Sequence, residues 1–277
     1  MKTMNQEHSW FEVDKTGLSK LLDHVGKHFA IFELVQNAWD ENSTTVKVTI
    51  ENHDDRGYST LIVEDDNPNG FADLSHAYTL FAESGKKGKT NKRGRFNLGE
   101  KLVLALCKTA TIETVGRQVT FHESGERTVE ASTRPSGSEF RAAIKMSKKE
   151  REECIASFHR LIPPPGIKTF LNGEELRQRE PVANFKASLP TIAADDEGKL
   201  FQTTRKAEVH LYEPKGGEKA SLYEMGIPVV ELEGRFHIDV QQKVPVNMDR
   251  DNVRPSYIKK IRVEILNNAH HLLTEED

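Results

Sequence analysis

A helical segment followed at once by two alternating strands constrains the fold of this chain more than any other feature. The helical pattern covers residues 27–42, and residues 46–50 then alternate apolar and polar side chains as a half-buried strand does. Turn formers at 54–57 lead into a second strand at 59–64, so the two strands are predicted to form a hairpin. A helix beside an antiparallel hairpin favours a layered α+β domain.

Segments on both sides of this helix and hairpin are predicted to belong to the same domain. Further helices are expected at 17–24, 74–81 and 96–107. Further strands are expected at 110–115, 118–121, 127–131 and 139–144. Because the antiparallel strands and the helices are grouped together, the sequence predicts a two-layer α/β sandwich.

A proline run marks a domain boundary. The charged helix expected at 148–160 is followed by Pro163, Pro164 and Pro165, which cannot continue a helix. We therefore expect a first domain at 1–160 and a smaller α+β domain at 161–277. The second domain is expected to contain a hairpin from 168 that turns at Asn172-Gly173, strands near 207–212 and 236–240, and a last helix at 256–273.

Composition and net charge limit the classes of protein to which this chain can belong. The chain has 277 residues and a formal net charge of −4, whereas proteins that coat duplex nucleic acid usually carry a strong basic excess. The two cysteines, Cys107 and Cys154, fit neither a zinc spacing nor a disulfide framework. Residues 1–8 are polar, and no apolar run has the length of a bilayer span. We expect a cytoplasmic protein without a membrane segment.

Three polar side chains are placed on one face of the helix at 27–42. Glu33, Asn37 and Asp40 follow the spacing i, i+4, i+7, and apolar residues occupy the other side. Asn is a mediocre helix former, so its position in mid-helix calls for a reason. The plain alternative is a solvated polar face on a surface helix.

Asp65 ends an apolar strand and opens a tight turn. A carboxylate there can accept a hydrogen bond from a buried exocyclic amine, such as that of adenine. The alternative is an Asp that serves only the turn. Asp66 competes for the same role, since the turn can be assigned in either register.

A glycine-containing segment precedes the helix expected at 96–107. Gly94 and Gly99 flank Arg95, Phe96, Asn97 and Leu98. Glycines before a helix let backbone N–H groups approach a phosphate, and the helix dipole favours the anion. Simple capping would explain the same glycines. The three elements in this order favour nucleotide binding more strongly than each does alone.

These segments resemble the motifs of the GHKL ATPases, which include gyrase B, the ninety-kilodalton heat-shock chaperone, histidine kinases and MutL; the ATP-binding component of topoisomerase VI shares them. Residues 33–40 look like the N box, 63–71 like the Asp-x-Gly-x-Gly box, and 94–99 like the glycine motif of the ATP lid. Gly137-Ser138 stands where the family often has Gly-Thr near adenine. The resemblance covers roughly 29–144 and implies the Bergerat ATP-binding fold, with ATP and Mg²⁺ bound.

The resemblance implies a role for each matching residue. Glu33 would be the general base, Asn37 the Mg²⁺ ligand, and Asp65 or Asp66 the reader of the adenine amino group. The other residues expected at the nucleotide are Asp40, Gly70, Gly94, Arg95, Phe96, Asn97, Leu98, Gly99 and Ser138. If Asp65 is the anchor, Asn67 and Asn69 replace two family glycines; if Asp66 is the anchor, only Gly70 matches. Asn97 replaces a further glycine. Asn tolerates positive φ better than other non-glycine residues, so the turn stays feasible.

The second domain has its own resemblance. Residues 244–251 are similar to the chaperone middle-domain stretch whose arginine reaches the γ-phosphate, and that residue would be Arg250. Lys243 is the rival, because other members use a lysine from this domain. A surface arginine in a charged loop is the plain alternative. The similarity implies a transducer-like domain that completes the site.

The function expected from these features is slow ATP hydrolysis that switches conformation or drives homodimerisation. One alternative is a nucleotide-dependent binding module that does not hydrolyse ATP. Another is the ATPase component of a DNA-handling assembly of the topoisomerase VI or MutL kind, with a separate partner. A protein client is a further possible partner. A histidine kinase is disfavoured, because the sequence offers no convincing phosphoacceptor helix pair.

Overall fold

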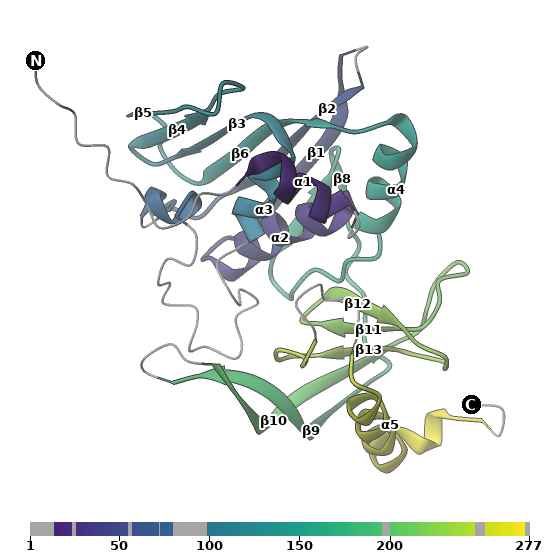
Figure 1. Cartoon of the computed structure of the whole chain (residues 1–277). Coiled ribbons are helices and arrows are strands. Elements are labelled where there is room, and N and C mark those ends of the chain that lie inside the picture. Colours follow the sequence, from purple (N-terminus) through teal and green to yellow (C-terminus); the bar gives the residue numbers. More distant parts are fainter. Residues whose placement is uncertain are drawn as a thin grey trace, which may run out of the picture.

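A computed structural model describes residues 14–23, 26–54, 57–71, 73–79, 99–195, 200–246 and 253–274 (Figure 1). The first part of the chain contains the helices and strands α1 (Lys15–Asp23), α2 (Lys27–Asp40), β1 (Thr45–Asp54), β2 (Tyr58–Asp65), η1 (Leu74–Ala77), α3 (Gly99–Leu106), β3 (Cys107–Thr114), β4 (Arg117–Phe121), β5 (Arg127–Ala131), β6 (Ser138–Lys145), α4 (Lys148–Phe158), β7 (Lys168–Leu171) and β8 (Glu174–Glu175). The second part contains β9 (Ala183–Ala194), β10 (Leu200–Tyr212), β11 (Ser221–Glu224), β12 (Ile227–Glu231), β13 (His237–Val240), α5 (Pro255–Ala269) and η2 (His270–Leu272).

The first sheet has eight strands in the order β5-β4-β3-β6-β2-β1-β7-β8. The predicted hairpin is present as β1 and β2, which pair antiparallel from Val46 opposite Asp65 onward. Helices α1 to α4 lie together on one face of this sheet (Figure 1). The two-layer α/β sandwich expected from the sequence is therefore confirmed.

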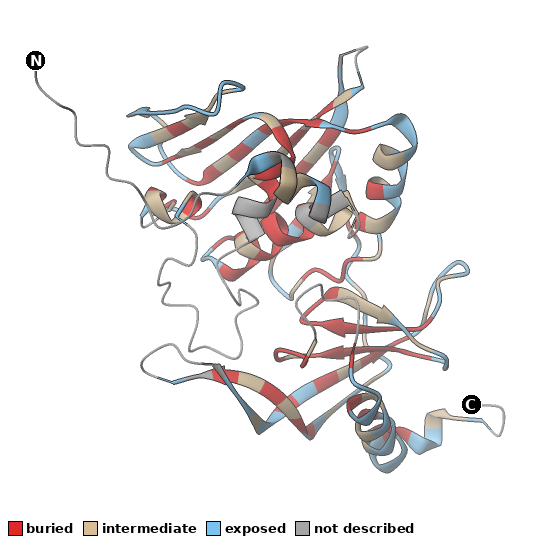
Figure 2. Cartoon of the chain, in the orientation of Figure 1, coloured by how far each residue is buried: buried red, intermediate tan, exposed pale blue. Residues whose placement is uncertain are grey.

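Helix α2 lies at the centre of this domain. Its apolar residues face both the sheet and the neighbouring helices, and all of the following are buried: Ile31, Phe32, Leu34, Val35, Ala38 and Trp39. Because these apolar side chains are removed from water on both sides, α2 forms part of the core of this domain. Figure 2 shows the buried residues concentrated on α2 and on the strands beneath it.

The hairpin β7–β8 belongs to the first sheet, so its assignment to the second domain is wrong. Strand β7 pairs parallel with β1, Lys168 opposite Thr45. At the turn, Asn172 and Gly173 have φ of 49° and 87°, as a two-residue hairpin requires. The Asn172 side chain accepts a hydrogen bond from the Ile50 N–H at 2.8 Å, which extends the pairing with β1. The Asn-Gly signal identifies the turn but not the neighbouring strand.

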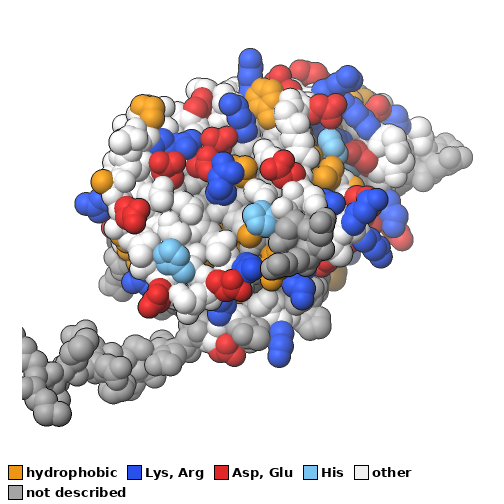
Figure 3. Space-filling view, turned by 90° about the horizontal axis from the view of Figure 1, so that it is seen from above, with side chains coloured by type: hydrophobic (Ala, Val, Ile, Leu, Met, Phe, Trp, Pro, Cys, Tyr) orange, Lys and Arg blue, Asp and Glu red, His pale blue; other side chains and the backbone are white. Residues whose placement is uncertain are grey.

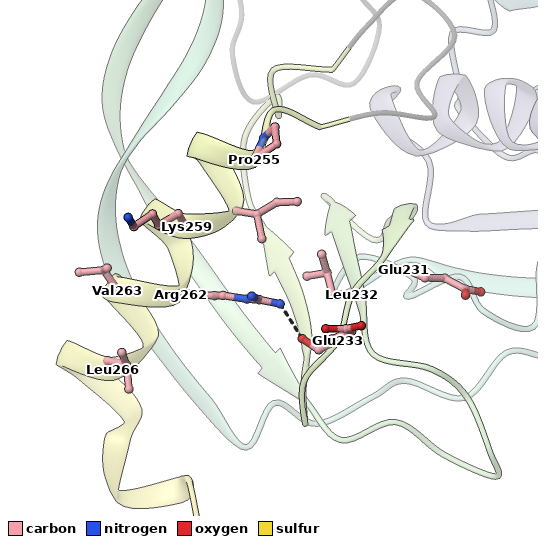
Figure 4. A pocket seen from close by; sticks show the side chains of 9 residues that line it. Glu231, Leu232, Glu233, Pro255, Lys259, Arg262, Val263 and Leu266 are labelled. Carbon is pink, nitrogen blue, oxygen red and sulfur yellow. Dashed lines mark hydrogen bonds between the residues drawn. The ribbon is translucent and has the colours of Figure 1, made fainter. Parts of the chain in front are cut away.

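The second sheet has five strands in the order β12-β11-β13-β10-β9, and its core includes residues of α5. Strands β9 and β10 form a long antiparallel ribbon, but β13 covers β10 only from Val209 to Tyr212. Helix α5 lies beside the end of β12, where Arg262 donates a hydrogen bond to the Glu233 carbonyl at 2.8 Å (Figure 4). This is the second α+β unit expected from the sequence.

The charge distribution on the surface and the lengths of the helices can both be compared with what the sequence predicts. Figure 3 shows Lys and Arg side chains interspersed with Asp and Glu over the upper face, without a continuous basic surface on that side. Within the described ranges, no helix combines the length and apolar character needed to span a bilayer.

The turn between β11 and β12 contacts the segment that follows α4. Ile162, which follows α4, donates its N–H to the Gly226 carbonyl at 3.0 Å. Gly226 has φ of 89°, and a Cβ there would lie 2.1 Å from the Ile162 carbonyl oxygen. Only glycine fits so close an approach of two backbones.

We therefore expect Gly226→Ala to lower the free energy of unfolding by about 2–4 kcal/mol, because positive φ and a backbone clash combine. Gly166→Ala is the matched control. Gly166 has φ of 84° but nothing within 4 Å of a built Cβ, so its loss should be about 1–2 kcal/mol. Urea unfolding of both variants measures the difference, and equal losses would contradict the close contact.

Candidate functional site

The polar face of α2 is buried, which excludes the solvated-face interpretation. Glu33 is 8 % exposed and Asp40 5 % exposed, and Asn37 between them is half-buried. Gln36 is also buried. Buried polar groups cost free energy unless polar partners satisfy them. A buried polar stripe in the core of this domain is a candidate ligand-binding face.

Asp66 stabilises the loop between α2 and β1. Its carboxylate accepts hydrogen bonds from the Thr44 N–H at 2.7 Å, the Thr44 hydroxyl at 2.6 Å and the Thr45 N–H at 2.9 Å. Burial opposes ionisation, but these hydrogen bonds outweigh it and lower the pKa of Asp66. Both carboxylate oxygens are thereby engaged by the protein itself.

Asp65, the last residue of β2, has a different environment. Burial raises the pKa of Asp65 to about 6, against a lowering by the hydrogen bond from the Asn67 N–H to Oδ1 at 2.9 Å. The nearby carboxylates of Glu41 and Asp66 raise it further. A carboxyl group with a strongly perturbed pKa is typical of a functional position.

Asn67 builds the turn that follows Asp65. It is 4 % exposed, and its carbonyl accepts the N–H groups of Gly70 at 3.0 Å and Gly137 at 2.9 Å. Its side-chain amide donates to the Gly70 carbonyl at 3.1 Å and accepts from the Asn69 N–H at 3.3 Å. Among the non-glycine residues that the structure describes, only Asn172 and Met225 have positive φ. Asn67 therefore replaces a glycine by side-chain hydrogen bonding, not by the positive φ that the sequence led us to expect.

Thr114, at the end of β3, fixes the far side of this turn. Its hydroxyl accepts the Phe71 N–H at 2.8 Å and lies 3.2 Å from the Ser138 hydroxyl. A Cβ on Gly70 would lie 2.1 Å from the Thr114 hydroxyl oxygen, so Gly70 is required there. Thr114 was not among the residues expected at the site. The usable signal was its position on the buried face of β3, two residues after Ile112.

Ser138 and Asp65 lie side by side in neighbouring strands. They are register partners at the ends of β6 and β2. Gly137 has φ of 73°, and a Cβ there would lie 2.1 Å from the Asp65 carbonyl oxygen. We call Asp65, Asn67, Gly70, Thr114 and Ser138 the Asp65 cluster. The structure thus brings together three of the residues selected from the sequence: Asp65, Gly70 and Ser138.

Two further selected residues, Gly99 and Lys243, are described outside the Asp65 cluster. Gly99 is the first residue of α3. Lys243 lies in the loop after β13 and is 2 % exposed, and its carbonyl accepts the Thr191 hydroxyl at 2.8 Å. Gly94, Arg95, Phe96, Asn97, Leu98 and Arg250 lie outside the described residues.

Comparison with known proteins gives the family of the first domain. Residues 25–154 match the family described as "Histidine kinase-, DNA gyrase B-, and HSP90-like ATPase". The matched range begins just before α2 and ends within α4, so it contains the polar face of α2 and the whole Asp65 cluster. This part of the chain is therefore a domain of the GHKL superfamily and has the fold of its ATP-binding domains.

One solved structure is similar to part of this chain. It is the crystal structure of the ATPase and transducer domains of DNA topoisomerase II from Balamuthia mandrillaris, with a TM-score of 0.44 and 17% sequence identity. The similarity covers 71% of this chain and 58% of that chain. No curated protein matches this sequence.

The raised pKa of Asp65 predicts that this residue destabilises the fold at neutral pH. A carboxyl group with a raised folded-state pKa contributes stability below its unfolded pKa and loses it as pH rises towards about 6. Asp65→Asn should therefore raise the free energy of unfolding at pH 7.5 by about 1–2 kcal/mol, after allowing for partial solvent screening. The gain should vanish near pH 4.

Asp66→Asn is the control, because its free energy of unfolding at pH 7.5 should change in the opposite direction. Because hydrogen bonds lower the pKa of Asp66, its contribution is present at neutral pH and is lost on acidification. This variant should therefore be less stable than the wild type at pH 7.5. Denaturant titrations at pH 4 and pH 7.5 measure the free energy of unfolding of both variants. If both variants were stabilised, or both destabilised, at pH 7.5, the opposite pKa shifts of Asp65 and Asp66 would be refuted.

Proposed function

We propose that the chain binds ATP and hydrolyses it with Mg²⁺ at the site formed by α2 and the Asp65 cluster. The premise is that residues 25–154 form a domain of the GHKL ATPase family. The observation that carries the proposal is the half-buried carboxyl group of Asp65, with its raised pKa, in the same domain as the buried polar face of the central helix α2.

Asp65, rather than Asp66, is the proposed reader of adenine. Both Asp66 oxygens already accept hydrogen bonds from Thr44 and Thr45. The Asp65 carboxylate has a raised pKa, and a donor such as the adenine amino group would stabilise its charged form. Ser138 lies next to Asp65 in the sheet, and its hydroxyl is held near Thr114. In this proposal Ser138 would add a second polar contact to adenine.

Glu33 and Asn37 are the proposed residues at the phosphates. They lie one helical turn apart on the same face of α2. Bound Mg²⁺ would neutralise charge on the phosphates and would take the Asn37 side-chain oxygen as a ligand. Glu33 would orient the attacking water and accept its proton.

The nucleotide state is proposed to change the arrangement of the two parts of the chain. Gly94 to Gly99 would close over the phosphates, with Arg95, Phe96, Asn97 and Leu98 between them, and Lys243 or Arg250 would reach the γ-phosphate. Asp40 would support the site from the end of α2. Nucleotide-driven homodimerisation remains a prediction, which sedimentation with and without a non-hydrolysable ATP analogue tests.

Glu33→Ala should abolish turnover and retain binding. Loss of a general base lowers kcat by about 100-fold or more, whereas the dissociation constant for ATP should stay within about threefold of the wild type. Phosphate release and titration with a fluorescent ATP analogue measure the two quantities. Surviving turnover would show that Glu33 is not the base.

Asp65→Asn should weaken ATP binding, whereas Glu33→Ala should affect turnover alone. Because it removes a charged hydrogen-bond acceptor, ATP affinity should fall about 10- to 100-fold. The loss should be much smaller for GTP, which lacks the adenine amino group. Asp66→Asn is the matched neighbour and should retain ATP affinity once folded. A larger loss in Asp66→Asn would assign adenine to Asp66 instead.

A further inference from the structure

A turn of the second sheet contacts the end of the helix that carries Glu33 and Asn37. A Cβ built on Gly226 would lie 3.7 Å from the Trp39 ring, and Gly226 pairs with Ile162 through its carbonyl. Trp39 is held in turn by a hydrogen bond of 3.0 Å from its indole N–H to the Thr169 hydroxyl. The Met225–Gly226 turn is thus packed against the first domain.

Two buried carboxylates connect this turn with the loop that follows β13. Asp239 is 2 % exposed; it accepts the Gly226 N–H at 2.9 Å through Oδ1 and the Gln241 side-chain amide at 2.6 Å through Oδ2. Glu224 precedes the turn, is 4 % exposed and accepts the Val244 N–H at 2.6 Å. The two carboxylates therefore hold both ends of residues 241–244, which we call the Lys243 loop.

The opposite side of the Lys243 loop is held by β9. The Gln242 side chain donates to the Leu189 carbonyl at 3.2 Å, and the Thr191 hydroxyl donates to the Lys243 carbonyl at 2.8 Å. Gln242, Lys243 and Val244 are all buried. The loop is thus fixed between β9 and the two acidic residues.

Burying Glu224 and Asp239 costs free energy, so their hydrogen bonds to the Lys243 loop are not explained by stability alone. Burying a carboxylate requires hydrogen-bond compensation, and buried ionic networks often stabilise less than apolar packing of the same volume. What buried polar networks supply is a defined geometry. Here the defined geometry relates Lys243, in the loop after β13, to the turn that lies near Trp39 at the C-terminal end of α2.

We propose that Glu224 and Asp239 are positioning residues that fix the Lys243 loop relative to α2 through the Met225–Gly226 turn. Lys243 would then move with α2, so that occupancy of the Glu33–Asn37 face and the placement of the lysine become coupled. The inference rests on the proposed ATPase function for its catalytic consequence, but the placement of the loop is testable without nucleotide.

The test compares Glu224→Ala, Glu224→Gln, Lys243→Ala and the double variant Glu224→Ala/Lys243→Ala. Glutamine retains a side-chain oxygen for the Val244 N–H, whereas alanine does not. Glu231→Ala is the control, because Glu231 lies on the neighbouring strand β12 and pairs with Arg160 at 3.6 Å and Lys219 at 3.2 Å instead. Hydrogen exchange of peptides covering 241–246 and 27–40, ATP binding and phosphate release are measured for each.

Without nucleotide, Glu224→Ala should speed exchange in 241–246 about tenfold or more, while Glu224→Gln and Glu231→Ala stay close to the wild type. Since a misplaced catalytic group costs up to about 100-fold in rate, Glu224→Ala should lower kcat about 10- to 100-fold with ATP affinity within about twofold. Glu224→Gln should restore most of kcat. In the Lys243→Ala background, Glu224→Ala should cause no further loss.

Two outcomes overturn the inference: unchanged exchange of 241–246 in Glu224→Ala, or losses of kcat that multiply in the double variant. The proposed function fails in a different way. In that case ATP with Mg²⁺ would not slow exchange of 27–40 in the wild type, while the nucleotide-free exchange of 241–246 would still decide whether Glu224 positions the loop.

Discussion

The enclosure of helix α2 is the constraint on which the rest of the structure depends. The sheet packs against one side, neighbouring helices cover another, and the Met225–Gly226 turn meets its C-terminal end. A helix so enclosed would be expected to be apolar throughout, yet Glu33, Gln36 and Asp40 are buried in it. They lie on the same face of α2 as Asn37, which is the face proposed to bind the nucleotide.

The local elements of the first domain were predictable because their signals are periodic and short-range. Helix α2 and the β1–β2 hairpin appear within a few residues of their expected bounds. Non-local pairing was not predictable. The β7–β8 hairpin has a clear turn signal, but its place beside β1 depends on contacts more than a hundred residues apart. Strand β9 and the first half of β10 were also missed, since Pro190 and several threonines obscure the alternation of apolar and polar side chains.

At the candidate site too, local features were predictable from the sequence and non-local contacts were not. Residue type and spacing selected Glu33, Asn37 and Asp65, and the family resemblance selected Ser138, but Asp65 and Asp66 remained equal candidates for the adenine contact. What separates them is a hydrogen-bonding partner 21–22 residues away, the Thr44–Thr45 segment, which engages Asp66. The role of Asn67 was likewise visible only once its side-chain hydrogen bonds were known. Local patterns give the residue types, whereas tertiary contacts decide which of two neighbours remains available.

The parallel pairing of β7 with β1 has a practical consequence for dividing this protein. A fragment cut at the proline run would end before β7 and leave the edge of β1 bare, although Val46, Val48 and Ile50 on that strand belong to the core. An uncovered edge with apolar residues is a template for aggregation. A soluble piece carrying the Asp65 cluster should instead extend through Leu176, whose N–H donates to the Thr169 carbonyl and closes the sheet.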